Sequence, residues 1–258
     1  MSENETETGA APGEEIRSNT VLAARREDIE LTTEDGLTLV GELALPADSD
    51  PVATLVMFHP LPTHGGFMDS HVYRKAALRL PALADLAVLR FNTRGTSSPR
   101  GTSEGSFDEG VGERYDVEAA LGFAVDRGLP EIWAVGWSFG TELTLKYVSQ
   151  PENAKLVRGA VLISPPLHRA EDADLRRWAQ TGLPLVVIVP EHDDYLQPPE
   201  ARERFALVPH AQVIEFEGSK HLLVGEKHVK RALETMAAAA LGLESVDLPT
   251  EVPAGLEG

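Results

Sequence analysis

The sequence has no cysteine, which excludes disulfide bonds, thiolate nucleophiles and cysteine-ligated metal sites. A chain without disulfides suits a reducing compartment. The N-terminal stretch MSENETETGAAPGEE carries glutamates but lacks the basic and apolar regions of a signal peptide. Long apolar runs are also missing, and none approaches the roughly 18 residues that a membrane-spanning helix needs. We therefore expect a soluble, cytoplasmic protein with no membrane partner.

Basic residues are few: 23 lysines and arginines face 41 aspartates and glutamates, which gives a net charge of -18. Residues 1–16 and 242–258 contain no lysine or arginine, and together they contribute -9. Phosphate recognition needs clustered basic side chains, so this composition disfavours nucleic-acid binding. The acidic ends predict a largely disordered N-terminal tail at 1–27 and an acidic C-terminal tail at 242–258. One folded domain is expected between them, at 28–241.

Hydrophobic residues make up 42% of the chain and recur as short apolar runs separated by helical patterns. Two alternating segments, 28–33 and 37–45, predict a hairpin at the edge of a sheet. Further strands are predicted at 53–58, 86–91, 132–135, 159–163, 183–189 and 211–216. Helices are predicted at about 70–84, 113–127, 170–181, 198–207 and 224–241, and after Ser138. Strands that alternate with helices form a mostly parallel sheet covered on both faces. The expected fold class is α/β, a three-layer α/β/α sandwich around a mostly parallel eight-stranded sheet.

One stretch combines a strand, a sharp turn and a helix around a serine. The apolar run 132–135 leads into Gly136-Trp137-Ser138-Phe139-Gly140, and a helical pattern follows. In a G-x-S-x-G turn of this kind the serine takes a strained conformation above the sheet, and a Cβ at either glycine would meet the neighbouring elements. The amide of Phe139 would lie at a helix N-terminus, where it can stabilise an anion.

A serine hydroxyl needs a nearby base to become a nucleophile, and the base needs an acid to orient it. Asp193 follows the apolar run 183–189, and His221 follows the run 211–216. The carboxyl ends of parallel strands meet at one edge of the sheet, so both side chains are expected near Ser138. Position in the loop favours Asp193 over the adjoining Asp194, which would then form a turn or a cap.

An acyl-transfer intermediate also needs a second amide donor for its oxyanion. The loop after the strand 53–58 supplies Leu61, the first residue after the His-Pro pair with a free N–H. Pro60 and Pro62 have none. Phe139 and Leu61 are therefore the predicted oxyanion donors.

Three residues near the expected strand ends are candidates for substrate binding: His59, Arg94 and Trp137. Two of them have a structural alternative, because Arg94 can form a turn with Gly95 and Trp137 can pack against a neighbouring strand. Histidines at 59, 64 and 71 are close in sequence, but no pair lies on one clear helix at ligand spacing. We therefore expect no metal site.

Four segments in combination resemble the α/β-hydrolase superfamily, and within it the small lidless bacterial branch related to dienelactone hydrolases and serine esterases. They are HPLPTHGGFMDS (59–70), VLRFNTRGTSSPRG (88–101), GVGERYDVEAAL (110–121) and VGWSFGTEL (135–143). The resemblance spans roughly 28–241, and it implies a triad of Ser138, Asp193 and His221 that needs no cofactor. Many relatives have His-Gly where this sequence has His59-Pro60.

The sequence thus predicts a serine hydrolase that cleaves a carboxylic ester or thioester of a small-molecule acyl substrate. Only about twenty residues separate the strands that hold Ile163 and Val186, so we expect an open site without a lid domain. Two alternatives stay open. One is a non-catalytic binding protein on the same scaffold, and the other is a peptidase that acts on short peptides.

Overall fold

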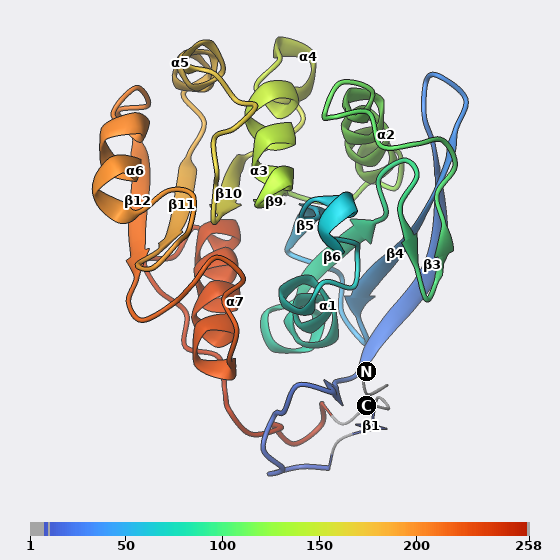
Figure 1. Ribbon diagram of the computed structural model, residues 1–258. Helices are drawn as coiled ribbons and strands as arrows, with labels where there is room; N and C mark the ends of the chain where they lie inside the picture. Colours follow the sequence, from blue (N-terminus) through green and yellow to red (C-terminus); the bar gives the residue numbers. More distant parts are fainter. Residues whose placement is uncertain (1–7, 10, 257–258) are drawn as a thin grey trace.

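The computed structural model describes residues 8–9 and 11–256, and an eight-stranded sheet lies at the centre of this part of the chain (Figure 1). The strand order is β12-β11-β10-β9-β5-β6-β4-β3. The strands are β3 (Ala24–Thr32), β4 (Thr38–Pro46), β5 (Ala53–Phe58), β6 (Leu86–Phe91), β9 (Ile132–Trp137), β10 (Gly159–Ile163), β11 (Leu185–Pro190) and β12 (Ala211–Phe216). All neighbours pair in parallel except β3 with β4 and β4 with β6. The predicted α/β fold, with its mostly parallel eight-stranded sheet, is confirmed.

Helices cover both faces of the sheet (Figure 1). The helices α1 (His71–Ala84) and α7 (Glu226–Leu241) pack on one face. The other face is covered by α2 (Glu113–Asp126), α3 (Phe139–Leu143), the π-helical turn η2 (Thr144–Val148), α5 (Asp172–Thr181) and α6 (Pro198–Phe205). The short helix α4 (Pro151–Ala154) follows η2. This arrangement is the predicted three-layer sandwich.

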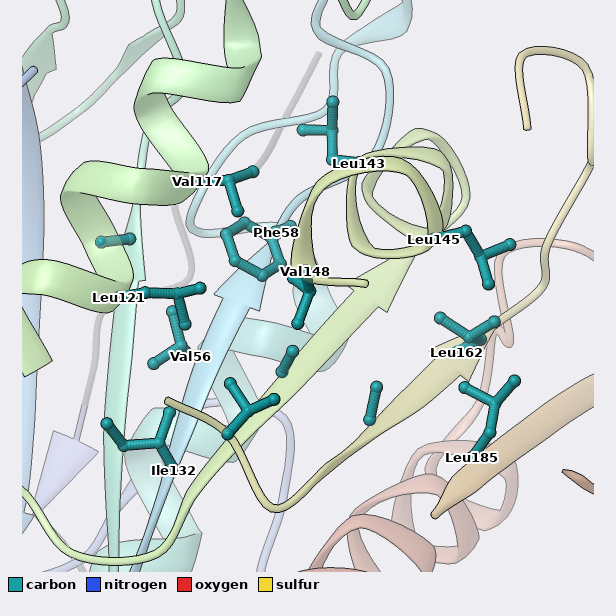
Figure 2. Packing of buried hydrophobic residues seen from close by; sticks show 14 of the residues in the cluster. Val56, Phe58, Val117, Leu121, Ile132, Leu143, Leu145, Val148, Leu162 and Leu185 are labelled. Carbon is teal, nitrogen blue, oxygen red and sulfur yellow. The ribbon is translucent and has the colours of Figure 1, made fainter. Parts of the chain in front are cut away.

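Alternation along β5 shows why a continuous apolar run forms a central strand. Val56 and Phe58 point to one face, where Val117 and Leu121 of α2 pack on them (Figure 2). Leu55 and Met57 belong to the cluster on the opposite face. Successive side chains of a strand point to opposite faces, so a strand covered on both sides is apolar at most positions, and Thr54 is the one polar residue of β5. All six residues of β5 are buried accordingly.

Two connections between elements begin at the carboxyl ends of the strands: the one from β10 to β11 and the one from β6 to α2. Between β10 and β11 the chain carries α5 alone, so the described chain has no lid domain there. The segment between β6 and α2 holds only the two-residue strands β7 (Ser97–Ser98) and β8 (Gly101–Thr102). None of the helices in the described chain combines the length and the apolar character that crossing a membrane requires.

The two ends of the chain differ from the predicted solvated tails where the structure describes them. Strand β3 begins at Ala24, inside the predicted tail, and β2 (Thr20–Val21) precedes it. The amide of Ile16 donates to the carbonyl of Thr250 at 2.8 Å, and Ile16 and Val252 are buried together. Apolar residues from both acidic ends of the sequence, Ile16 and Val252, thus pack in one cluster. Residues 1–7, 10 and 257–258 lie outside the described residues, and so does that part of the tail prediction.

Candidate active site

Ser138 sits between the end of β9 and the start of α3 with φ 51° and ψ -115°. This conformation is strained for a residue with a side chain, at a cost of order 1–3 kcal/mol. The amide of Ser138 donates to the carbonyl of Ile163 at 2.8 Å, and its own carbonyl accepts from the amide of Thr141 at 2.9 Å. These bonds to the neighbouring strand and to the helix hold the strained residue in place at the carboxyl edge of the sheet.

The two glycines of the turn are required by close approach of the backbone. A Cβ added to Gly136 would lie 2.4 Å from the carbonyl oxygen of Gly140. One added to Gly140 would lie 1.8 Å from the carbonyl oxygen of Phe58, on the neighbouring strand β5. Real Cβ atoms do not approach a backbone oxygen so closely, so both positions must be glycine for the serine to turn outward.

We expect Gly140→Ala to lower the free energy of unfolding by more than about 3 kcal/mol, because the colliding atoms are backbone and cannot rotate away. Urea unfolding of the variant and the wild type measures the difference. The matched control is Gly122→Ala in α2, where an added Cβ meets nothing within 4 Å. That control should gain about 0.5–1 kcal/mol from helix propensity. An equal effect of both substitutions would contradict the close approach at Gly140.

His221, Asp193 and Ser138 come together at this edge from three separate strand ends. Nε2 of His221 lies 2.8 Å from Oγ of Ser138, and Nδ1 lies 2.9 Å from Oδ2 of Asp193. A carboxylate can only accept, so Nδ1 carries the proton and Nε2 is free to accept from the serine hydroxyl. Asp193 is 2% exposed, whereas Asp194 is exposed and lines the cleft beside it. Of the two adjoining aspartates, Asp193 is therefore the one that contacts the His221 ring.

Both the backbone carbonyl and the ring of His221 make contacts that fix its position. Its carbonyl accepts a hydrogen bond of 2.8 Å from Oγ of Ser164, which follows β10. The amide of Tyr195 donates to Oδ1 of Asp193 at 2.9 Å. The Tyr195 ring then meets the His221 ring edge-on, with 4.7 Å between centroids. Aspartate and histidine are thus fixed relative to each other before any substrate arrives.

The predicted oxyanion donors, Leu61 and Phe139, both line the cleft beside Ser138. The Leu61 carbonyl accepts from the amides of His64 at 3.1 Å and Gly66 at 3.0 Å, which fixes the direction of this turn. A Cβ on Gly66 would lie 2.1 Å from the carbonyl oxygen of Pro60, so this glycine permits the tight turn. Within residues 11–256, neither the Leu61 amide nor the Phe139 amide donates to an acceptor. Both are therefore available to an anion above the serine.

The cleft around these groups has a volume of about 540 Å³. Its walls come from the loops that follow β5, β9, β10, β11 and β12. Apart from Ser138, its lining residues are Pro60, Leu61, His64, Phe139, Pro166, His168, Arg169, Asp194, Tyr195, His221 and Leu222. No metal-binding group of three or more histidine or acidic side chains occurs in the part of the chain that the structure describes.

Comparisons with known proteins agree with this architecture. A family model described as alpha/beta hydrolase fold matches residues 61–187. The chain has the α/β-hydrolase fold. Among curated proteins, an uncharacterized protein of Rickettsia prowazekii (strain Madrid E) is 28% identical over 157 residues, which are 59% of this chain and 61% of that protein. The match thus spans about three fifths of the relative's length.

Solved structures of several α/β hydrolases share the fold. A Xanthomonas campestris α/β serine hydrolase without a lid superposes with a TM-score of 0.65 and 24% identity, covering 86% of this chain and 94% of that chain. The esterase Pf2001 of Pyrococcus furiosus gives a TM-score of 0.69 with 17% identity, covering 85% and 91%. A serine hydrolase homologue from Coxiella burnetii gives 0.66 with 22% identity, covering 82% and 95%. At these identities the likeness concerns the fold.

Three predicted substrate contacts of this α/β hydrolase are not in the cleft. His59 is fully buried, and its Nε2 accepts from the amide of Thr93 at 3.0 Å while Nδ1 lies 2.6 Å from the carbonyl of Pro60. Since Nε2 accepts, Nδ1 donates to the Pro60 carbonyl, directly before the Leu61 amide. His59 therefore braces the loop that carries a candidate oxyanion donor instead of touching substrate.

Arg94 and Trp137 are also buried and engaged elsewhere. The Arg94 guanidinium binds Asp116 at 2.8 Å and Asp35 at 2.9 Å, which ties the turn after β6 to α2 and to the β3–β4 hairpin. Trp137 is 1% exposed and packs edge-on against His71 and Tyr73 of α1. Both residues take the structural role that the sequence left open as an alternative.

Cleft residues that the sequence did not single out include His168, Arg169, Tyr195 and Leu222, and His64 was considered only as a metal ligand. The first four are loop residues, and no periodicity marks which side chains of a loop turn toward a cleft. Proximity to a strand end was the one available signal, because Tyr195 and Leu222 follow within two residues of Asp193 and His221. His168 and Arg169 lie farther from β10 and carried no such signal.

Burial lowers the pKa of His59 to about 4 from the usual 6.5. Unfolded His59 therefore binds a proton as the pH falls below 6.5, while the folded protein resists protonation until about pH 4. The stabilisation is complete above pH 6.5 and is lost as the pH falls toward 4, by about 3 kcal/mol between pH 7 and pH 4.

Urea unfolding at pH 7 and pH 4 measures this loss in the wild type and in His59→Gln. The variant should lack that part of the pH dependence. An unchanged pH dependence in His59→Gln would show that the buried ring is not the source.

Proposed function

We propose that this protein is a serine hydrolase that cleaves a carboxylic ester or a thioester. The observation that carries the proposal is the 2.8 Å contact between Oγ of Ser138 and Nε2 of His221, whose other nitrogen binds the buried Asp193. A hydroxyl, an imidazole and a buried carboxylate in this order are the groups that acyl transfer needs. The amides of Leu61 and Phe139, which donate to no acceptor within residues 11–256, would supply the remaining component, the oxyanion donors.

The proposed reaction proceeds through an acyl-enzyme. Oγ of Ser138 attacks the carbonyl carbon while Nε2 of His221 takes the hydroxyl proton, and the amides of Leu61 and Phe139 hold the oxyanion. The tetrahedral intermediate collapses, and the imidazolium returns the proton to the departing alkoxide or thiolate. A water then repeats the attack on the acyl-enzyme with the same histidine as base. Asp193 stabilises the imidazolium in both halves and stays ionised throughout.

The shape of the cleft favours small or polymer-end acyl substrates. No lid domain covers it in the described chain, and its walls mix apolar side chains such as Leu61 and Leu222 with polar ones. An open cleft of about 540 Å³ is within the usual size range of small-molecule sites. One similar solved structure is described as an esterase and another as a serine hydrolase, which is consistent with this reading.

A substrate panel tests the proposal and separates it from its rivals. We expect the full chain to hydrolyse short p-nitrophenyl esters and acyl thioesters faster than aminoacyl nitroanilides. A preference for the nitroanilides would indicate a peptidase. Turnover of no substrate by folded protein would favour a non-catalytic binding role.

A further inference from the structure

Glu142 is a buried carboxylate on the helix that begins beside the nucleophile. It lies in α3, four residues after Ser138, and is 1% exposed. It neither lines the cleft nor contacts Ser138, Asp193 or His221 in any described interaction. A carboxylate in such a place costs free energy unless its oxygens are fully satisfied.

Three consecutive backbone amides donate hydrogen bonds to the Glu142 carboxylate. Oε1 accepts from the amide of His168 at 2.7 Å, and Oε2 accepts from the amides of Arg169, at 3.0 Å, and Ala170. Within the described residues no lysine, arginine or histidine side chain forms an ion pair with it. All three of these hydrogen bonds are therefore directed at one short segment of the loop after β10.

That segment forms one wall of the cleft. His168 and Arg169 both line it, together with Pro166. The loop is strained, because Leu167 has φ 51°, a left-handed conformation that is costly for a residue with a Cβ. Lys146 of η2, which directly follows α3, helps to hold it, since its Nζ donates to the carbonyl of Arg169 at 3.2 Å.

The wall contacts the residues around Ser138 and His221. The His168 ring meets the Tyr195 ring edge-on at 5.2 Å, and Tyr195 in turn meets His221. On the other side, the Arg169 guanidinium lies 5.4 Å from the ring centroid of Phe139. A shift of this loop would therefore move the surface that a substrate touches, while none of its residues takes part in the hydrogen bonds among Ser138, His221 and Asp193.

We propose that Glu142 is a positioning residue that pins the His168–Ala170 wall to the nucleophile helix and thereby sets how tightly substrate is held. Lys146 helps to hold the same segment, because its Nζ donates to the carbonyl of Arg169. The inference rests on the proposed function where it concerns substrate, and on the contacts alone where it concerns the loop.

Glu142→Gln tests the loop directly. Glutamine keeps the size but offers one oxygen and an NH₂ group, so at least one of the three amides loses its acceptor. Hydrogen exchange followed by mass spectrometry should show the amides of residues 168–170 exchanging about tenfold faster than in the wild type. Glu152→Gln, an exposed residue of α4, is the matched control and should leave exchange there unchanged. Unchanged exchange in Glu142→Gln would overturn the proposal.

Kinetics test the consequence for substrate. With p-nitrophenyl butyrate we expect KM to rise about tenfold in Glu142→Gln while kcat stays within about threefold. The rate of labelling by a small fluorophosphonate, which depends chiefly on the reactivity of the serine, should stay near that of the wild type. Equal losses in labelling and turnover would overturn the proposal, because Glu142 would then act through Ser138.

Lys146→Met provides a second route if Glu142→Gln folds poorly. It removes one donor to the wall, keeps the length of the side chain, and should show the same pattern at smaller amplitude. Unchanged exchange at residues 168–170 in a folded Lys146→Met would contradict the pinning. If wild-type protein hydrolyses no ester and takes no label, the proposed function fails, while the exchange measurement still decides whether Glu142 holds the loop.

Discussion

Replacing Ser138 by alanine is expected to lower kcat for a p-nitrophenyl ester by about 10⁶-fold while KM changes little. The hydroxyl is the only side-chain group in the proposed reaction that bonds to the acyl carbon, so no neighbouring residue is expected to substitute for it. The cleft walls and the two amides stay in place, which is why binding should survive. Steady-state kinetics with purified protein measure both constants.

The control for this variant is Ser106→Ala, which removes an exposed hydroxyl from the loop between β8 and α2. It should retain wild-type rates. A residual rate in Ser138→Ala within about tenfold of the wild type would mean that the serine is not the nucleophile. Circular dichroism of both variants establishes that the comparison is made on folded protein.

Asp193→Asn is expected to lower kcat by about 10⁴-fold, by analogy with the effect of this change in other serine hydrolases. The reason lies in the hydrogen bond that Nδ1–H of His221 donates to the Asp193 carboxylate at 2.9 Å. An asparagine that turns its NH₂ toward the ring would favour the opposite tautomer, in which Nε2 carries the proton and cannot accept from Ser138. It would also leave the imidazolium without its counter-charge.

Asp194→Asn is the matched comparison, because it makes the same chemical change one residue along the chain. Asp194 is exposed and makes no contact with His221 among the described interactions. Its replacement should change kcat by less than about threefold, with any effect appearing in KM because the residue lines the cleft. Equal losses in both variants would contradict the assignment of Asp193.

The neighbourhood of Ser138 could be predicted from sequence because its determinants are local. An apolar run, two glycines four residues apart and a following helical pattern all lie within twenty residues, and the structure has β9, the strained turn and α3 in these places. The parallel sheet followed from strands that alternate with helices. Asp193 and His221 could then be placed at the same edge as Ser138 by their position after strands.

The side toward which a loop residue points could not be predicted in this way. His59, Arg94 and Trp137 all stand at strand ends as expected, yet each turns into the protein and finds a partner there. Their orientation is set by loop backbone and by distant elements, such as Asp116 on α2 for Arg94. The cleft wall at His168 and Arg169 depends likewise on Glu142, and hydrophobic periodicity records none of these contacts.

The ends of the chain illustrate a second limit of local reasoning. Residues 11–23 have the composition of a solvated tail, but Ile16 packs with Leu22 and Val252 on a satellite of the core. The pairing joins segments more than 200 residues apart, as in the bond from the Gly13 amide to the Val252 carbonyl. Contacts of this range depend on the finished fold, which brings both ends to the same side of the sheet (Figure 1).

The central claim is that Ser138 is an activated nucleophile, and covalent labelling tests it most directly. Wild-type protein is treated with a fluorophosphonate, and the site of the adduct is mapped by peptide mass spectrometry. We predict one adduct per chain on Ser138, its loss in Ser138→Ala and its retention in Ser106→Ala. Folded wild-type protein that takes no label, or takes it at another residue, would contradict the account.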